Sequence, residues 1–318
     1  MNEAEARRSE EAGHQQRTAG WADDAELLRD SSAGLLGSLD LVERGPDVFE
    51  ARHQRIPSGR AYGGEVVAQA VEAVTRTVDV ERPIHSIHGY FLRAADVMRL
   101  TTWQVDRLRD GRTVSSRAVR GHQDGRVVFQ GLASFQVPGK GPEHEVPMPT
   151  GIPGPEELPT SAEVLAGTDD VRDTRYWSHE RSFDMRHWPS PVYVHGDAAE
   201  DEPEFQVVWL KSYDRLPDDP RLHRTALAYL CDYTMLEPAL RRHRTAWADD
   251  GLMTASLDHA MWWHRDDARV DEWIAFVQQS PAASHGRGTG YGRLYTRQGG
   301  LIATVMQEGV LSLPGHGG

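Results

Sequence analysis

Residues 63–78 read GGEVVAQAVEAVTRTV, and this stretch decides the fold class. Its apolar side chains recur at helical spacing, so they form one face of a predicted helix. A helix with so apolar a face must be covered by other elements of the fold. That face consists of Val66, Val67, Ala70, Val71 and Val74.

The residues after this helix predict an antiparallel sheet. Turn residues at Asp110-Gly111 and Asp124-Gly125 separate strand-like runs, and both dipeptides favour tight hairpins. A helical start at 33–42 and a short strand at 49–53 (FEARH) come before the helix. The predicted strands after it are 84–92, 100–108, 113–122 and 127–137.

The same order of elements occurs a second time, after a Pro- and Gly-rich stretch at 138–159. Arg93 lies 43 residues before Gln136, and Arg265 lies 42 residues before Gln307. This matched spacing predicts an internal duplication. The second copy consists of a strand at 206–212, a helix at 221–240 and strands near 253–264, 272–279, 288–295 and 301–311.

A sheet that curls around its helix buries the apolar face, and this arrangement is the hot-dog fold. We expect an α+β protein, a double hot-dog of two tandem units, each a long helix wrapped by an antiparallel sheet. Placing the two sheets side by side would remove two exposed edges. The expected divisions are a disordered tail at 1–33, an N-terminal hot-dog at 34–138, a linker and irregular connection at 139–200 and a C-terminal hot-dog at 201–318.

Composition disfavours several classes of partner. The 318 residues include 35 Lys and Arg against 48 Asp and Glu, and the net charge of −13 repels nucleic acid. No run approaches the roughly 18 apolar residues of a membrane span, and no signal peptide is recognisable. The single cysteine, Cys231, suits a reducing compartment, and no peroxisomal Ser-Lys-Leu signal is present. We therefore predict a cytoplasmic protein that binds neither nucleic acid nor membranes.

Asp232 is the first candidate for chemistry. It lies in LAYLCDYTMLEPAL, inside the predicted helix 221–240, among apolar neighbours. An ionised carboxylate that leaves water needs hydrogen-bond donors or a cation, so such a residue is often functional. The alternative is that Asp232 only braces a neighbouring loop.

Ser256 and Gln307 interrupt two predicted strands. Ser256 belongs to TASLDHAMWWHR, and because no Gly-x-Ser-x-Gly elbow is present, it is expected to position water rather than attack. Gln307 belongs to IATVMQEGVLSL, where a buried amide must find partners for both of its ends. The alternatives are that Ser256 is structural and that Gln307 caps a strand end near Gly309.

Neither a metal nor an organic cofactor is expected. The histidines at 85, 88, 259 and 264 have no cysteines nearby, and strand alternation spreads them over different faces. The chain contains no Gly-x-Gly-x-x-Gly and no P-loop motif for a nucleotide cofactor.

Several sequence blocks in one order resemble the acyl-CoA thioesterase II family, whose members are double hot-dog proteins that hydrolyse fatty-acyl-CoA thioesters. The resemblance extends from about Leu36 to Leu311. Its blocks are AYGGEVVAQA at 61–70, HSIHGYFLR at 85–93, RDGR at 109–112, ASFQVP at 133–138, SLDHAMWWHR at 256–265 and TVMQEGV at 304–310.

The resemblance implies a function and a site. Family members use an Asp, a Thr or Ser, and a Gln to orient and activate water, and the matching positions here are Asp232, Ser256 and Gln307. It also implies an acyl-CoA substrate and a role in fatty acid metabolism. A homo-oligomer of double hot-dog units is a further expectation.

The first copy departs from the family pattern. It has Gly63-Gly64-Glu65 where the family commonly has Gly-Gly-Gln, and Leu92-Arg93-Ala94-Ala95 where the family has Leu-Arg-Pro-Gly. One hypothesis is that Glu65, with Gln136 and Ser86, is the remnant of a second site. The alternative is that Glu65 is structural and pairs with an arginine.

Two other functions stay open at this point. A non-catalytic protein that binds or senses acyl-CoA would use the same fold. A hot-dog enoyl-CoA hydratase would need an Asp and a His close together. Asp258 and His259 are adjacent in the sequence, but neighbouring residues of a strand face opposite sides of the sheet.

Overall fold

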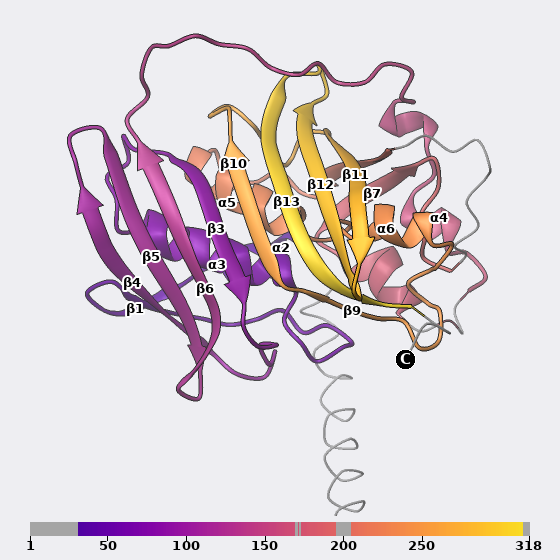
Figure 1. The fold of residues 1–318 in the computed structure, drawn as a ribbon, viewed down its shortest axis with the longest axis horizontal. Helices are drawn as coiled ribbons and strands as arrows, with labels where there is room; N and C mark the ends of the chain where they lie inside the picture. The colour runs from indigo at the N-terminus through magenta and orange to yellow at the C-terminus, as the bar shows by residue number, and fades with distance from the viewer. Residues whose placement is uncertain (1–30, 169–170, 172, 195–204, 314–318) are drawn as a thin grey trace, which may run out of the picture.

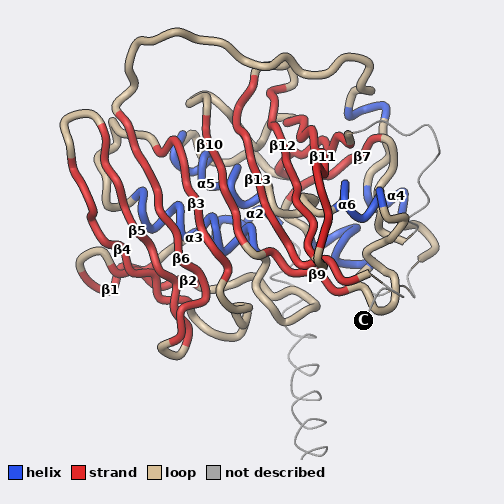
Figure 2. The backbone as a smooth tube through the Cα atoms, in the orientation of Figure 1, coloured by secondary structure: helices blue, strands red, loops and turns tan. Residues whose placement is uncertain are grey.

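One antiparallel sheet organises the molecule. The computed structural model describes residues 31–168, 171, 173–194 and 205–313. Within these residues thirteen strands form a single sheet (Figure 1, Figure 2), and β9 (Met253–Ser256) pairs with the end of β13. The others, in their order across the sheet, are β1 (Val42–Gly45), β2 (Val48–Ala51), β4 (Thr101–Asp110), β5 (Val114–Gln123), β6 (Arg126–Gln136), β3 (Ile84–Phe91), β10 (Asp258–Trp263), β13 (Leu301–Ser312), β12 (Arg287–Thr296), β11 (Ile274–Ser284), β8 (Gln206–Ser212) and β7 (Phe183–Trp188).

Two antiparallel helices, α3 (Gly63–Thr75) and α5 (Pro220–Leu230), cover one face of the sheet (Figure 1). Near the start of α5, Arg221 donates to the carbonyl of Val78, just beyond the end of α3, over 3.1 Å. The side chain of Asp219 accepts the backbone N–H of Arg221 at 2.9 Å, which caps α5. The remaining helical elements are α2 (Ser31–Leu39), α4 (Ser161–Val164), α6 (Glu237–Arg242), a 3₁₀ turn η1 (Pro155–Glu157) and a π turn η2 (Tyr176–Glu180).

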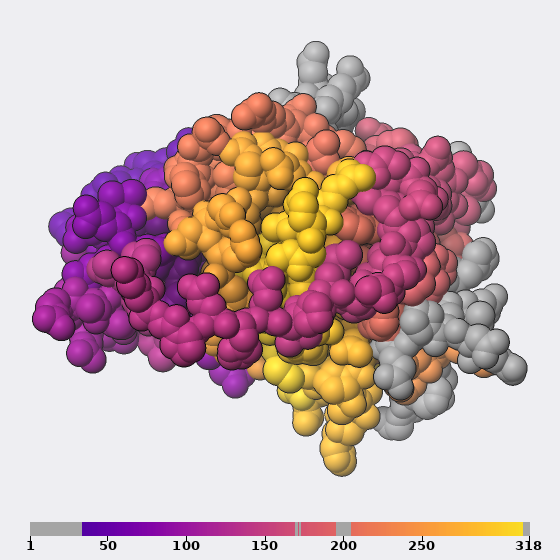
Figure 3. Space-filling view, turned by 90° about the horizontal axis from the view of Figure 1, so that it is seen from above, coloured from indigo at the N-terminus to yellow at the C-terminus, as the bar shows by residue number. Residues whose placement is uncertain are grey.

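The two halves of the sheet meet where β3 pairs with β10. Ile87 lies opposite Met261 in this ladder, and both side chains are buried. Outward from the junction the strand order is β3-β6-β5-β4-β2 in one half and β10-β13-β12-β11-β8 in the other. The predicted double hot-dog, with its sheets side by side, is therefore confirmed. After β6 the chain crosses the edge of the sheet toward the far side of the C-terminal half (Figure 1, Figure 3).

The predicted helix 221–240 is wrong in its second half. Helix α5 ends at Leu230, and a separate helix, α6, begins at Glu237. Pro238 lies in the first turn of α6, where its missing N–H is tolerated, whereas the interior of one continuous helix would exclude it. In addition, the carbonyl of Tyr229, in the last turn of α5, accepts a hydrogen bond from the hydroxyl of Tyr62 at 2.8 Å. Tyr62 directly precedes α3, so a residue next to that helix supplies the partner that this carbonyl would lack at a helix end.

Other boundaries differ from the sequence expectations as well. The predicted strand 253–264 is divided at Leu257, whose backbone bonds to Glu308 on one side and to Phe91 on the other. The stretch 139–200, expected to be irregular, contains strand β7. The helical start expected at 33–42 is α2, which begins at Ser31 and ends at Leu39. Of the expected tail 1–33, residues 1–30 lie outside the described residues.

The contact between α3 and α5 yields a test of stability. A Cβ added at Gly64 would collide with the carbonyl oxygen of Tyr229, whereas a Cβ at Gly37 in α2 would meet nothing within 4 Å. We expect Gly64→Ala to lower the free energy of unfolding by about 1–3 kcal/mol, because the helices must move apart. Gly37→Ala, the matched control, should cause no loss. Urea unfolding curves measure both, and equal midpoints for the two variants would contradict the expectation.

Candidate active site

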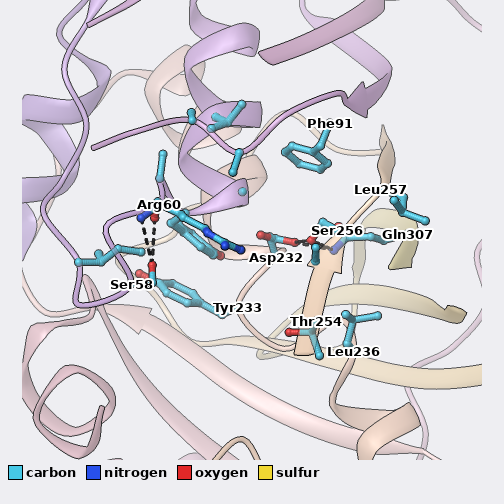
Figure 4. A pocket seen from close by; sticks show the side chains of 18 of the residues that line it. Ser58, Arg60, Phe91, Asp232, Tyr233, Leu236, Thr254, Ser256, Leu257 and Gln307 are labelled. Carbon is cyan, nitrogen blue, oxygen red and sulfur yellow. Dashed lines mark hydrogen bonds between the residues drawn. The ribbon is translucent and has the colours of Figure 1, made fainter. Parts of the chain in front are cut away.

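A cavity of about 540 Å³ lies between the two halves of the protein. Tyr62, Gly63 and Phe91 line it from the N-terminal half, and Asp232, Ser256 and Gln307 line it from the C-terminal half. Figure 4 shows the last three side chains next to one another, with Phe91 and Arg60 reaching in from the other half. The three candidate residues from the sequence are therefore together, in a cavity of a size usual for small-molecule sites.

Asp232 occupies the turn after α5, not the helix interior predicted from the sequence. The carboxylate accepts Gln307 Nε2 at 2.6 Å and Ser256 Oγ at 3.2 Å, both through Oδ1. The backbone N–H of Gly64, in the first turn of α3, is a third donor to it. Oδ2 lies so close to Gly63 that a Cβ there would be 2.5 Å away. The carboxylate of one half thus sits against the positive end of the other half's helix.

Opposing effects set the proton affinity of Asp232. Burial raises the pKa of Asp232 above the ordinary value, because the charged form loses hydration. Hydrogen bonds from Gln307, Ser256 and the backbone of Gly64 lower the pKa, but they do not cancel the rise. A carboxylate with a raised pKa is a stronger proton acceptor than one in water.

Gln307 is held at both ends of its amide. Its Nε2 donates to Asp232 at 2.6 Å and to Ser256 Oγ at 2.8 Å. Its Oε1 lies 2.8 Å from Nδ1 of His259. Burial lowers the pKa of His259, so the neutral ring donates its Nδ1–H and fixes which way the amide points. The alternative, in which Gln307 only caps a strand end near Gly309, does not match these contacts.

His259 is the residue whose place the sequence reasoning missed. It belongs to the Asp258-His259 pair considered for a hydratase. The structure separates the two side chains: Asp258 Oδ1 accepts the backbone N–H of Glu308 at 2.7 Å, while His259 faces Gln307 on the buried side. Because buried and partly exposed residues alternate along β10, the inward direction of His259 was the signal available in the sequence.

Glu65 does not form a second site with Gln136 and Ser86. It is fully buried and does not line the cavity; its carboxylate lies 2.8 Å from Nδ1 of His53 and accepts the backbone N–H of Gln54 at 2.8 Å. Gln136 is exposed at the end of β6. The alternative of a structural Glu65 matches the geometry, except that its partner is a histidine and not an arginine.

Other reactive groups take no part in this arrangement. Burial raises the pKa of the Cys231 thiol well above its usual value, which leaves it protonated and unreactive. Within the described ranges no cluster of three or more His, Cys, Asp or Glu side chains is arranged to hold a metal ion. In the same ranges no helix has the length and apolarity to cross a membrane.

Family models match both halves of the chain. The model described as acyl-CoA thioesterase matches residues 179–310, and the model described as acyl-CoA thioesterase N-terminal domain matches residues 52–136. The chain is 34% identical to acyl-coenzyme A thioesterase 8 of Homo sapiens, over 86% of this chain and 87% of that protein. It is 31% identical to acyl-CoA thioesterase 2 of Haemophilus influenzae, over 89% of this chain and 99% of that protein.

Solved structures show the same relationship. An acyl-CoA thioesterase II, TesB2, from Mycobacterium marinum is 34% identical and superposes with a TM-score of 0.71, covering 89% of this chain and 99% of its own. A hot-dog protein of unknown function from Alicyclobacillus acidocaldarius is 17% identical and superposes with a TM-score of 0.68, covering 87% of this chain and 97% of its own. At this identity the likeness supports the fold alone. Since relatives above 30% identity are matched over most of their length, the chain belongs to the acyl-CoA thioesterase II family and is an acyl-CoA thioesterase with the double hot-dog fold.

Proposed function

We propose that this enzyme hydrolyses fatty-acyl-CoA to a free fatty acid and CoA, with a water molecule activated by Asp232, Ser256 and Gln307. The observation that carries the proposal is the shared hydrogen bonding of these three side chains inside one cavity. The raised pKa of Asp232 suits a general base, which must accept a proton near neutral pH.

The reaction follows from these roles. Asp232 takes a proton from water as the oxygen of that water attacks the thioester carbonyl. The carbon–sulfur bond then breaks, and the proton held by Asp232 passes to the sulfur, so that CoA leaves as the thiol. The hydroxyl of Ser256 and the amide of Gln307 fix the position of the water, which removes the entropy cost of aligning it. No acyl-enzyme is needed, because water is the nucleophile. The hydratase alternative lacks support, since Asp258 and His259 diverge.

Location and assembly stay predictions. The sequence predicts a cytoplasmic enzyme with acyl-CoA as substrate and without nucleic acid or membrane partners. Homo-oligomers of the double hot-dog unit also stay a prediction. The oligomeric state can be measured with the same purified protein that serves the assays below.

Replacing the general base tests the mechanism directly. We expect Asp232→Asn to lower kcat/KM by roughly 10²- to 10⁴-fold, because the amide cannot accept the proton. The measurement is thiol release from acyl-CoAs of increasing chain length. Asp258→Asn is the matched control, since Asp258 only accepts a backbone N–H on β13, and it should retain near wild-type activity. Equal rates for Asp232→Asn and the wild type would exclude Asp232 as the base.

The pH profile tests the environment of Asp232. Only the ionised carboxylate accepts a proton, so kcat/KM should fall as the pH falls through a pKa above the ordinary range of aspartate. The hydrogen bond from Gln307 lowers this pKa, so Gln307→Met should raise it and move the acid limb to higher pH. Gln136→Met, at an exposed position of β6, is the control and should leave the limb in place. An acid limb that Gln307→Met does not move would contradict the assignment.

A further inference from the structure

We propose that Gln278 and Thr234 are positioning residues, whose hydrogen bond holds the turn that carries Asp232 in its reactive place. The proposal rests on the thioesterase function proposed above. Both side chains are fully buried, and neither residue lines the cavity. They would therefore act on the reaction through Asp232 and not through contact with the substrate.

The turn between α5 and α6 consists of residues 231–236, and Asp232 is its second residue. Because α5 ends before this turn and α6 begins after it, the regular hydrogen bonds of the helices do not extend through it. Its backbone lies close against the sheet: a Cβ added at Gly290 of β12 would collide with the carbonyl oxygen of Met235. Such a contact stops the turn from moving closer to the sheet, but it does not stop the turn from moving away.

Gln278 supplies a directional bond between the sheet and the turn. Its side chain lies on the buried face of β11, and Nε2 donates to the hydroxyl of Thr234 at 2.8 Å. Thr234 is two residues beyond Asp232 in the same turn. Since a hydrogen bond weakens with both distance and angle, this one restrains the height of the turn above β11 and its rotation.

A buried carboxylate decides which way the amide of Gln278 points. Gln206 occupies the paired position on β8, and its Nε2 donates to Oε1 of Gln278 at 2.8 Å and to Oε2 of Glu237 at 3.1 Å. An ionised carboxylate only accepts hydrogen bonds, so Glu237 selects the Nε2 end of Gln206. That end requires the oxygen of Gln278 as its second acceptor, and the Nε2 of Gln278 consequently faces Thr234.

Glu237 remains ionised inside the protein. It is the first residue of α6, and its Oε1 accepts the indole N–H of Trp247 at 3.0 Å, while Oε2 lies 3.3 Å from Nε2 of His187. Burial alone would raise the pKa of Glu237, but interactions with His187 and Trp247 lower it below the ordinary value. The carboxylate is therefore an acceptor at neutral pH, and the orientation of both amides is fixed.

This network is a poor device for stability alone. Two glutamines, a threonine and a glutamate lose their hydration at positions where apolar side chains would pack without that cost. A hydrogen-bonded network instead specifies one geometry. The turn needs such precision, because Oδ1 of Asp232 must stay 2.6 Å from Gln307 and 3.2 Å from Ser256. A displacement of about 1 Å can lower a reaction rate by about 100-fold.

Removing either end of the bond tests the proposal. Thr234→Val keeps the shape of the side chain and deletes the hydroxyl, and Gln278→Met keeps an unbranched side chain and deletes the amide. We expect each variant to lower kcat per folded enzyme by about 10- to 100-fold, because the base is displaced. KM should change little, because most residues that line the cavity lie outside the turn. Thr234→Ser, which retains the hydroxyl, should retain activity.

The pH profile separates positioning from a loss of stability. Hydrogen bonds from Gln307 and from the backbone of Gly64 lower the pKa of Asp232, so a displaced turn weakens them and raises that pKa. The acid limb of kcat/KM should therefore move to higher pH in Thr234→Val and in Gln278→Met. Because the two variants break the same bond, the double variant should be no slower than the slower of the two.

Gln279→Met is the matched control, because Gln279 is the next residue of β11 and points to the opposite face of the sheet. It should change neither kcat nor the acid limb. An unchanged kcat or an unmoved acid limb in Thr234→Val would overturn the proposal, even if Gln278→Met did not fold. Additive losses in the double variant would overturn it as well, and so would equal losses in Thr234→Ser and Thr234→Val. The proposed thioesterase function fails separately, if Asp232→Asn retains wild-type activity.

Discussion

The site depends on the close contact between the first turn of α3 and the last turn of α5. Gly64 has no side chain, so the carbonyl of Tyr229 can approach it, and the hydroxyl of Tyr62 donates to that carbonyl at 2.8 Å. The chain then leaves the helix, and Asp232 turns toward the N–H of Gly64 and toward Gln307. The contact between Gly64 and Tyr229 therefore lies where α5 ends and joins α5 to α3. The same contact places the carboxylate of Asp232 beside the first turn of α3.

The duplicated fold carries one candidate site because equivalent ladder positions differ. In the C-terminal half, His259 of β10 contacts Gln307 of β13. The 172 residues between Arg93 and Arg265 put Ile87 at the position of His259, and the residue opposite Ile87 on β6 is Ala133. These apolar side chains cannot hold a carboxylate or a water molecule. The N-terminal half instead satisfies its buried acid, Glu65, through His53, so it contributes a helix end and a wall of the cavity.

Local patterns predicted the elements, and contacts between distant residues decided where they end. Helix α3 could be predicted because the spacing of its apolar residues is a local property of the sequence. The turn at Asp124-Gly125 could be predicted for the same reason, since these residues tolerate the positive φ angles of 49° and 73° that the turn requires. The end of α5 depends on Tyr62, which lies 167 positions from Tyr229, although Pro238 was a local signal of the break. Asp232 was predicted from its apolar neighbours. The resemblance was needed for Ser256 and Gln307, since polar residues in strands are common.

Asp232 and arginines such as Arg60 line the cavity of a protein with a net charge of −13. The negative field repels any acyl-CoA at long range, and salt screens that repulsion beyond about 8 Å at physiological ionic strength. Attraction must therefore arise locally, first at exposed rim cations such as Arg60 and then by burial of the acyl group. Selectivity between acyl groups consequently has to arise from short-range contacts inside the cavity, where charges are screened least.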